Sequence, residues 1–278
     1  MYDADCVAFL RWALPRLGLN WPGFQRVHRQ VCKRLARRLK ELKIGDFAQY
    51  REYVLDHDAE WGTVDSCCRI TISRLYRDGA VFDFLTQQVL QKLASDARKR
   101  RIRAIYAWSA GCGAGEEPYS LTLAWRFAVI PRVGDIDLKI VATDIDEGQL
   151  ARARNGCFGP STLRELPRDW KAAAFVASGP LLCLRSEYCE GIEFLHQDVR
   201  AQAPEGPFDL VLCRNLAFTY FDETQRRQTY AMLWSKIRDG GWLVIGRRER
   251  LPEVESCPMA QVPGLPIYEK IDQAARNA

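Results

Sequence analysis

The sequence predicts an α/β protein in which a mostly parallel sheet follows a small all-helical domain. Three observations support this prediction. Leucine and valine recur at three- and four-residue steps early in the chain, short apolar runs separated by helix-length segments begin near residue 102, and the first of these runs ends in a glycine-rich turn. A period near 3.6 indicates helices, whereas strands that alternate with helices indicate a parallel sheet.

Length and composition are those of a folded chain with one large domain and one small one. Of the 278 residues, 47% are hydrophobic and 27% are charged, and they include 8 Trp and 12 Phe. This composition excludes a disordered protein. No apolar stretch is long enough to cross a membrane, and the N-terminus lacks a signal-peptide pattern. We therefore expect a cytoplasmic protein with no direct membrane insertion.

The cysteines and histidines do not form a recognisable metal site. The 10 Cys and 3 His are scattered, and no Cys-x-x-Cys pair occurs. Without a secretion signal, reduced thiols are expected. The spacings match none of the usual zinc patterns, so we expect no bound metal.

We assign residues 1–95 to the helical domain. Val31, Leu35 and Leu39 recur on one helical face, and basic residues occupy the other faces of the same helix. Such a basic segment is either a solvated face or a docking surface for an acidic partner. The docking candidates are Arg34, Arg37, Arg38 and Lys40. Nucleic acid is not expected, because aromatic residues are not interleaved with the basic ones and no reading motif is present.

We assign residues 96–278 to the α/β domain, whose first strand follows an exposed basic connection at Ser95–Arg103. Helices are expected over Glu117–Ala128 and 146–155, and a small insertion over about 160–190, where prolines and Trp170 interrupt the periodicity. The expected strands are Ile102–Trp108, Leu138–Thr143, Ile192–Leu195, Phe208–Cys213 and Trp242–Ile245.

The glycine-rich turn that follows the first apolar run is the strongest chemical signal. It reads Ser-Ala-Gly-Cys-Gly-Ala-Gly after Trp108 and leads into a helix that starts with Glu116 and Glu117. Glycines allow the backbone to approach a ligand, and a helix start exposes amide donors. The turn lacks the Lys-Ser/Thr of a phosphate loop, and two glutamates would repel a pyrophosphate. The acidity instead favours a cationic ligand.

An aspartate at the end of the second run has the position of a ribose ligand. Asp144 follows Val141-Ala-Thr, and its carboxylate can accept hydrogen bonds from both hydroxyls of a ribose. Asp146 then serves as the N-cap of the next helix. The alternative is that both aspartates are only capping residues.

These motifs resemble the chemotaxis receptor methyltransferases, the CheR family, and the resemblance spans nearly the whole chain. It is carried by Trp108–Ser120, by Ala142–Asp146 continuing to Ala153-Arg-Asn-Gly156, and by Phe208–Asn215 followed by Tyr220-Phe-Asp222. The resemblance implies a Rossmann-like domain that uses S-adenosylmethionine to methylate glutamate side chains and releases S-adenosylhomocysteine. The implied partner is an acidic protein, such as the cytoplasmic domain of a chemoreceptor.

The resemblance also implies roles for individual residues. Glu117 would bind the amino group of the methionine moiety, Asp144 the ribose, and Asp198 with Val199 the adenine ring. Arg77 and Tyr220 are the catalytic candidates, with Tyr220 close to the transferable methyl; alternatively, Arg77 is a structural ion-pair partner and Tyr220 a core residue. The implied cofactor-binding set is Thr71, Ser73, Arg77, Gly111, Glu117, Asp144, Asp198, Val199, Arg214 and Asn215.

The chain departs from the family pattern at several places. Thr71 and Ser73 replace an Asn and a Thr, and one extra residue precedes Tyr220. After the last strand, Arg247-Arg-Glu-Arg250 stands where the family has His-Ser-Glu. This cationic loop supports two alternatives to the receptor-glutamate reaction. The acceptor is a different carboxylate, on a more acidic protein or a small molecule, or the chain is a catalytically weakened cofactor-binding regulator.

Overall fold

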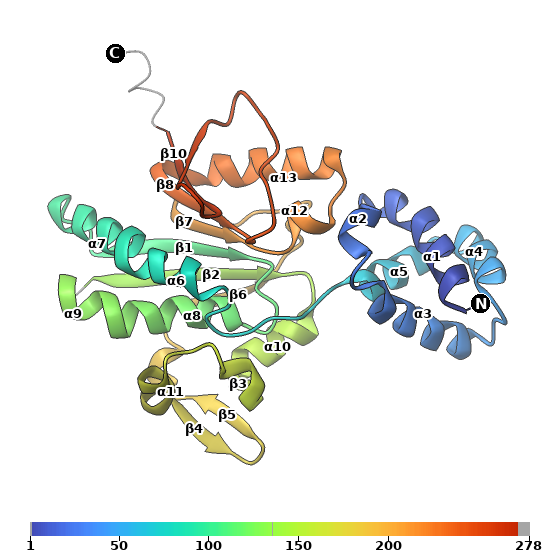
Figure 1. Ribbon diagram of the computed structural model, residues 1–278, viewed down its shortest axis with the longest axis horizontal. Helices are drawn as coiled ribbons and strands as arrows, with labels where there is room; N and C mark the ends of the chain where they lie inside the picture. The colour runs from blue at the N-terminus through green and yellow to red at the C-terminus, as the bar shows by residue number, and fades with distance from the viewer. Residues whose placement is uncertain (1, 135, 272–278) are drawn as a thin grey trace. The chain divides into compact units, whose positions relative to one another are not determined.

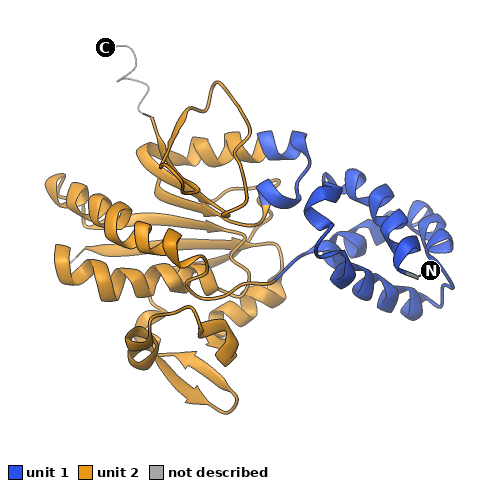
Figure 2. Cartoon of the chain, in the orientation of Figure 1, with its two compact units in different colours: residues 1–71, 217–227 blue, residues 72–216, 228–278 orange. Residues whose placement is uncertain are grey.

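The computed structural model describes residues 2–134 and 136–271 and divides the chain into two compact units (Figure 2). The first comprises residues 1–71 and 217–227, and the second residues 72–216 and 228–278. The boundary therefore differs from the one predicted at residue 95. The segment that begins at Ile72 packs with the second unit because Tyr76 N donates to Ser120 Oγ (2.7 Å) and Leu75 N donates to Thr162 O (3.0 Å).

The first unit is helical. Phe9, Val31, Leu35, Leu39 and Tyr50 form part of its buried core, as the three-and-four spacing on the basic helix predicts. Its elements are α1 (Tyr2–Ala13), η1 (Leu14–Leu17), α2 (Trp21–Phe24), α3 (His28–Leu42), α4 (Phe47–Asp56), α5 (Glu60–Cys68) and α12 (Ala217–Tyr220), and α13 (Glu223–Lys236) begins in this unit and ends in the second.

A short late segment of the chain joins the first unit through backbone contacts. Asn20 N donates to Tyr220 O (2.8 Å), and Asn20 Nδ2 donates to Phe221 O (2.6 Å). Leu19 and Phe221 also form an isolated β-bridge. These contacts are between residues about two hundred positions apart, which a sequence pattern of short period does not encode.

Two of the four docking candidates are engaged inside the first unit. Arg38 donates to both oxygens of the buried Glu60 (2.8 Å each), and Tyr50 donates to the same carboxylate (2.7 Å). The hydrogen bond from Arg38 lowers the pKa of Glu60. Arg34 donates to the carbonyls of Cys67 and Arg69 at the end of α5. Arg34 and Arg38 therefore hold α3 against α5, because their side chains donate to acceptors at the two ends of α5.

The expectation of reduced thiols is wrong for four cysteines. Cys6 of α1 is bonded to Cys32 of α3, with Cα atoms 5.9 Å apart. Cys157 and Cys183, which face each other across two antiparallel strands, form a second disulfide. Both pairs are separated by 26 residues, so only the folded chain brings them together.

The second unit contains a seven-stranded sheet in the order β6-β2-β1-β7-β8-β10-β9 (Figure 1). The first five strands in this order pair in parallel, whereas β10 is antiparallel to β8 and β9 is antiparallel to β10. The strand order reverses beside β1, which is where open α/β sheets bind ligands. The strands are β1 (Ala104–Ala110), β2 (Asp137–Asp144), β6 (Ile192–His196), β7 (Phe208–Cys213), β8 (Ile237–Ile245), β9 (Met259–Gln261) and β10 (Ile267–Lys270).

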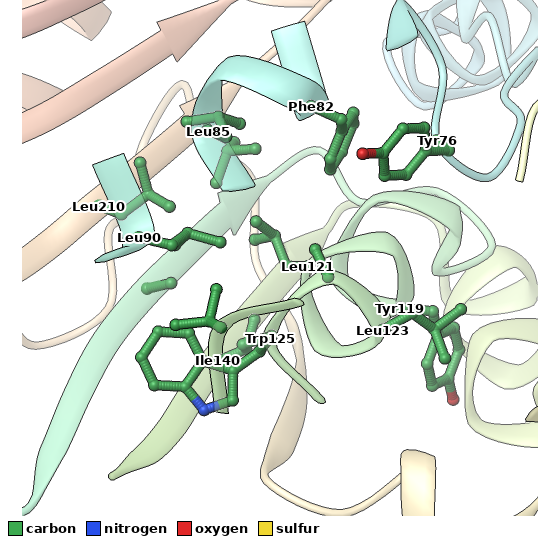
Figure 3. Close-up of a cluster of buried hydrophobic side chains, with 14 of the residues drawn as sticks. Tyr76, Phe82, Leu85, Leu90, Tyr119, Leu121, Leu123, Trp125, Ile140 and Leu210 are labelled. Atoms are coloured by element: carbon green, nitrogen blue, oxygen red, sulfur yellow. The ribbon is translucent and has the colours of Figure 1, made fainter. Parts of the chain in front are cut away.

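Helices pack on the sheet through a large apolar cluster (Figure 3). In this cluster Leu85 and Leu90 pack with Trp125 from the helix after β1, with Ile140 of β2 and with Leu210 of β7. The basic segment expected to be an exposed connection is helical as far as residue 99. The helices are α6 (Gly79–Phe84), the π-helical η2 (Leu85–Val89), α7 (Leu90–Lys99), α8 (Glu116–Ala124), the π-helical η3 (Trp125–Val129), α9 (Ile130–Val133) and α10 (Glu147–Asn155).

The interval of the expected insertion holds a separate three-stranded sheet in the order β3-β5-β4. Its elements are β3 (Cys157–Phe158), η4 (Pro160–Leu163), α11 (Arg168–Ala174), β4 (Phe175–Ser178), β5 (Leu181–Leu184) and η5 (Ser186–Tyr188). Across the described parts of the chain, no helix combines the length and the apolarity needed to cross a bilayer.

Candidate active site

The glycine-rich turn connects β1 to α8 at the carboxyl end of the parallel strands. Gly111, Gly113 and Gly115 have φ values of +77°, +56° and +90°, a region that side chains disfavour. The amides of Gly111 and Cys112 both donate to Thr143 O, at 2.8 and 3.0 Å. These bonds tie the turn to the end of β2, so the glycine turn and Asp144 lie side by side.

Replacing Gly111 by alanine should destabilise the second unit. A Cβ at this position would lie 2.3 Å from Leu216 Cδ2, and the positive φ adds backbone strain. Together we expect a loss of about 3 kcal/mol in the free energy of unfolding, measured by urea denaturation. Gly179→Ala is the matched control, because Gly179 has φ +56° and no neighbouring atom within 4 Å of a Cβ. Equal losses in the two variants would contradict the close packing against Leu216.

Glu117 lies at the start of α8 with 12% of its side chain exposed, and it has two partners. Ser109 Oγ donates to its Oε1 (2.7 Å), and Arg214 Nη1 lies 3.3 Å from its Oε2. Burial raises the pKa of Glu117, and the positive charges of Arg214 and Arg77 oppose that rise. The carboxylate is therefore oriented by Ser109 and stabilised in its charged form by Arg214.

Arg214 links the end of β7 to the segment before α6. Its side chain is 4% exposed, and its Nη2 donates to Asp78 Oδ2 (2.7 Å) and to Arg77 O (2.9 Å). The guanidinium also lies over the ring of Phe82, 5.3 Å from its centroid. One buried cation thus holds Glu117 and Asp78 together, because each carboxylate needs a compensating charge in this environment.

Asp144 occupies the end of β2, next to β6. Its Oδ2 accepts from Gly113 N (2.8 Å), and its Oδ1 accepts from Asp146 N (2.9 Å). β6 ends beside it, since His196 is in register with Asp144, and the chain continues directly to Asp198 and the buried Val199. The structure thus brings the predicted ribose residue and the predicted adenine residues to neighbouring strand ends. Asp198 itself pairs with Arg200 (2.8 Å).

Asn215 is held by a carboxylate from the loop after β8. Asn215 has φ +57°, and its amide donates to Glu249 Oε2 (2.8 Å), which also accepts from Gly246 N (2.5 Å). Glu249 is buried, so water does not reach its carboxylate, and these two amides supply hydrogen bonds in place of water. The loop after β8 is therefore anchored to the end of β7.

The remaining predicted residues lie in two places. Ser73 and Arg77 belong to the segment that leads into α6, and Arg77 Nη1 donates to Ile72 O (2.9 Å). Thr71 is the exposed last residue of the first unit's main segment. Tyr220 also belongs to the first unit, where its ring packs against Phe24 with centroids 5.0 Å apart. The roles of Thr71 and Tyr220 towards the cofactor stay predictions.

Three side chains of the site were not among the predicted residues. Ser109 orients Glu117, Asp78 pairs with Arg214, and Glu249 anchors Asn215. Each stands next to or within a motif that the sequence does reveal. Their roles were missed because a hydrogen bond between distant segments leaves no local pattern.

The donor set fits a ligand with an amino group and a hydroxylated ring. Glu117 supplies a carboxylate at the start of α8, bound to Ser109 of β1, and Asp144 supplies another at the end of the neighbouring β2, bound to the glycine turn through Gly113 N. Arg214 Nε and Glu116 Oε2 are buried without a hydrogen-bond partner in the parts of the chain that the structure describes. Within the same residues no cluster of His, Cys, Asp or Glu could hold a metal ion. The polar groups thus suit an organic cofactor that has both donors and acceptors.

Comparison with known proteins identifies the cofactor. Residues 71–263 match the family model described as CheR methyltransferase, SAM binding domain. The chain is 31% identical to a probable chemotaxis protein methyltransferase of Rhizobium etli, over 80% of this chain and 84% of that one. It is 28% identical to the chemotaxis protein methyltransferases of Listeria innocua, over 90% and 91% of the two chains, and of Escherichia coli, over 81% and 77%.

The matched family model covers well over half of the chain and includes the glycine turn, Glu117, Asp144 and Arg214. The domain binds S-adenosylmethionine, and the chain is a methyltransferase. On its fold, its strand-end carboxylates and this match, the chain belongs to the CheR methyltransferase family.

Proposed function

We propose that this chain transfers the methyl group of S-adenosylmethionine to glutamate side chains in the cytoplasmic domain of a chemoreceptor. The observation that carries the proposal is Glu117, oriented by Ser109 and paired with Arg214, next to the carboxylate of Asp144. Curated relatives that match most of the chain are chemotaxis protein methyltransferases, which supports this choice of acceptor.

We assign the cofactor contacts to individual side chains by their chemistry. Glu117 binds the positively charged amino group, because its carboxylate is buried and already oriented. Asp144 accepts from the ribose hydroxyls, because its carboxylate is oriented by the amides of Gly113 and Asp146 and a carboxylate can accept several hydrogen bonds. Val199, with Asp198, lies beside the adenine ring, and the backbone at Gly111 allows close approach of the ligand.

The reaction requires alignment rather than proton transfer. The cofactor supplies a methyl group on a sulfonium centre, which a carboxylate can attack directly. A glutamate has a pKa of about 4.3 in water, so the acceptor is already ionised at neutral pH and needs no general base. Holding the reacting atoms near contact distance can contribute roughly 7–11 kcal/mol to lowering the barrier.

Residues of the segment before α6 are proposed to position the acceptor. Arg77 bears a positive charge that acts on Glu117, and an acceptor carboxylate beside it would be held by the same charge. Ser73 offers a hydroxyl in the same segment, and Thr71 another at its start. Tyr220 is proposed to place its ring against the sulfonium, where an aromatic face stabilises a cation.

The exposed face of α3 is the proposed docking surface for the receptor. Since Arg34 and Arg38 have partners within the first unit, the surface consists of other cations on the same helix. The members of this docking face are Arg29, Lys33, Arg37 and Lys40, all exposed. Steps of four, four and three residues separate them, which places them on one side of the helix, opposite the buried Val31 and Leu35.

The proposed reaction is tested by incubating the protein with radiolabelled S-adenosylmethionine and purified receptor cytoplasmic domains. We expect label in the receptor that is released by mild base as methanol, as for a carboxylate methyl ester. The modified residue is then located by mass spectrometry. Absence of any base-labile label, with cofactor binding intact by calorimetry, would overturn the receptor-glutamate reaction.

Reversing charge on the docking face should weaken receptor recognition without affecting the cofactor. We expect Arg37→Glu with Lys40→Glu to raise the KM for a receptor domain about tenfold at low salt, with less effect as salt increases. Cofactor affinity should not change. Arg100→Glu with Arg132→Glu, two exposed cations of the second unit, is the matched control. An equal rise in KM for the control would show that only net charge matters.

A further inference from the structure

A cavity of about 810 Å³ lies in the second unit beside the loop that follows β8. The loop contributes Arg247, Glu249 and Arg250, the β9–β10 hairpin contributes Tyr268, and the start of α6 contributes Asp78. The cavity is thus formed beside the Arg-Arg-Glu-Arg sequence of residues 247–250. No role described so far uses Arg247 or Arg250.

The charged groups of the lining are two carboxylates and two guanidinium groups, those of Asp78, Glu249, Arg247 and Arg250. Asp78 is paired with Arg214, and Glu249 accepts from the amides of Asn215 and Gly246, and none of these three partners lines the cavity. The charge of Arg250 acts on Tyr268, where it opposes the rise that burial gives to the pKa of the hydroxyl. Arg247 is exposed and has no ion pair or hydrogen bond among the residues that the structure describes. The cavity therefore offers a guanidinium fork to an anion.

The cavity adjoins the network that holds the cofactor-facing carboxylate. Asp78 lines the cavity and shares Arg214 with Glu117, through contacts of 2.7 and 3.3 Å. Glu249 lines the cavity and anchors Asn215, which follows Arg214 directly. Asp78 and Arg214 therefore connect the lining of the cavity to Glu117.

We infer that this cavity is a specificity subsite that holds an acidic side chain of the protein acceptor, near the glutamate that is methylated, with Arg247 as its partner. The inference rests on the proposed function in its choice of a protein acceptor. Charge complementarity favours a carboxylate, because Arg binds a planar carboxylate through two parallel hydrogen bonds. The volume exceeds that of one side chain, so the subsite also accommodates the adjoining backbone of an acceptor segment.

The loop offers an internal comparison for this subsite. Arg247 and Arg250 line the cavity, whereas Arg248, which stands between them and is also exposed, does not. Arg248 carries the same charge on the same loop, so it reports the effect of general electrostatic attraction. A difference between Arg247 and Arg248 thus isolates the contribution of the cavity.

The first experiment measures methylation of a receptor cytoplasmic domain in which each acidic residue near the methylated glutamate is changed in turn to its amide. One such change should lower kcat/KM about tenfold in the wild-type enzyme. Arg247→Ala should lower kcat/KM by the same factor on the unchanged receptor and have no further effect on the amide variant. Arg248→Ala should have a much smaller effect on both receptors.

A charge exchange gives the sharper test. Arg247→Glu should methylate the unchanged receptor poorly, and a receptor with lysine in place of the critical acidic residue should recover most of the lost activity. Binding of S-adenosylhomocysteine, measured by calorimetry, should be equal in all variants, which shows that the cofactor site is intact. Equal effects of Arg247→Ala and Arg248→Ala, or no dependence on any acidic residue, would overturn the subsite.

A binding measurement separates this inference from the proposed reaction. Calorimetry is performed on the full chain saturated with S-adenosylhomocysteine. The probes are two peptides built from alanine, one that carries glutamate and one that carries glutamine in its place. The glutamate peptide should bind more tightly, and Arg247→Ala should remove most of the difference while Arg248→Ala retains it. This pattern without any receptor methylation would support the subsite and reject the receptor as substrate. Equal binding of the two peptides to the wild-type protein would reject the subsite whether or not receptors are methylated.

Discussion

Arg214→Met should lower the free energy of unfolding of the second unit by roughly 3–5 kcal/mol, since removing one partner of a buried ion pair leaves an uncompensated charge. Arg214 is 4% exposed and pairs with both Asp78 and Glu117. Methionine keeps much of the side-chain volume but supplies neither charge nor donors. Chemical denaturation followed by far-UV circular dichroism measures the loss.

Neutralising the carboxylates that have lost Arg214 as their partner should restore part of that stability. Adding Glu117→Gln and Asp78→Asn to Arg214→Met removes two negative charges on side chains that are 12% and 23% exposed, so the triple variant should be more stable than the single one. Arg132→Met, at an exposed arginine, is the control and should change stability little. An unchanged unfolding midpoint for Arg214→Met would show that the network does not contribute to stability.

Glu117→Gln should weaken cofactor binding about a hundredfold, the effect of losing one buried charge-assisted interaction of a few kcal/mol. The amide keeps the shape of the side chain and can still interact with Ser109, but it no longer attracts a positively charged amino group. Isothermal titration calorimetry with S-adenosylhomocysteine measures the change. Glu205→Gln, at an exposed glutamate, controls for net charge. Wild-type affinity in Glu117→Gln would place the amino group elsewhere.

The pH dependence of cofactor affinity should also report the charge of Glu117. Burial raises the pKa of Glu117, and only its charged form attracts the amino group. As the pH falls, affinity should therefore begin to decrease at a higher pH than an ordinary glutamate would produce. Glu117→Gln should lack this part of the pH dependence. A wild-type affinity that is constant through the mildly acidic range would contradict the assignment.

The motifs of the α/β domain were recognisable because each depends on local backbone chemistry. Gly111, Gly113 and Gly115 adopt positive φ at the turn after β1, which glycine permits and which a sequence therefore displays. Asp146 caps α10, with its side chain accepting from Gln149 N (3.1 Å). Apolar runs mark the five parallel strands, because strands buried on both faces require them.

Other features of the fold could not be predicted from the linear pattern. β9 and β10 are three and four residues long and lie among prolines and glycines, so their apolar content is too short to indicate strands. The helices over residues 79–99 continue the helical pattern of the first unit but belong to the second. Helical periodicity shows that a face is buried and does not show what covers it.

The amino-acid pattern alone was sufficient for the order of the five parallel strands, the glycine turn, the acidic residues at the start of α8 and the end of β2, and a cationic ligand. Each of these is specified by residues within a few positions of one another. Tertiary structure decided that Arg38 pairs with Glu60 rather than facing a partner, that Arg214 joins Glu117 to Asp78, and that Arg247 lines a cavity while Arg248 does not. The reason is physical: a charged side chain takes its role from the nearest opposite charge and from its exposure to water, and both depend on segments that only folding brings together.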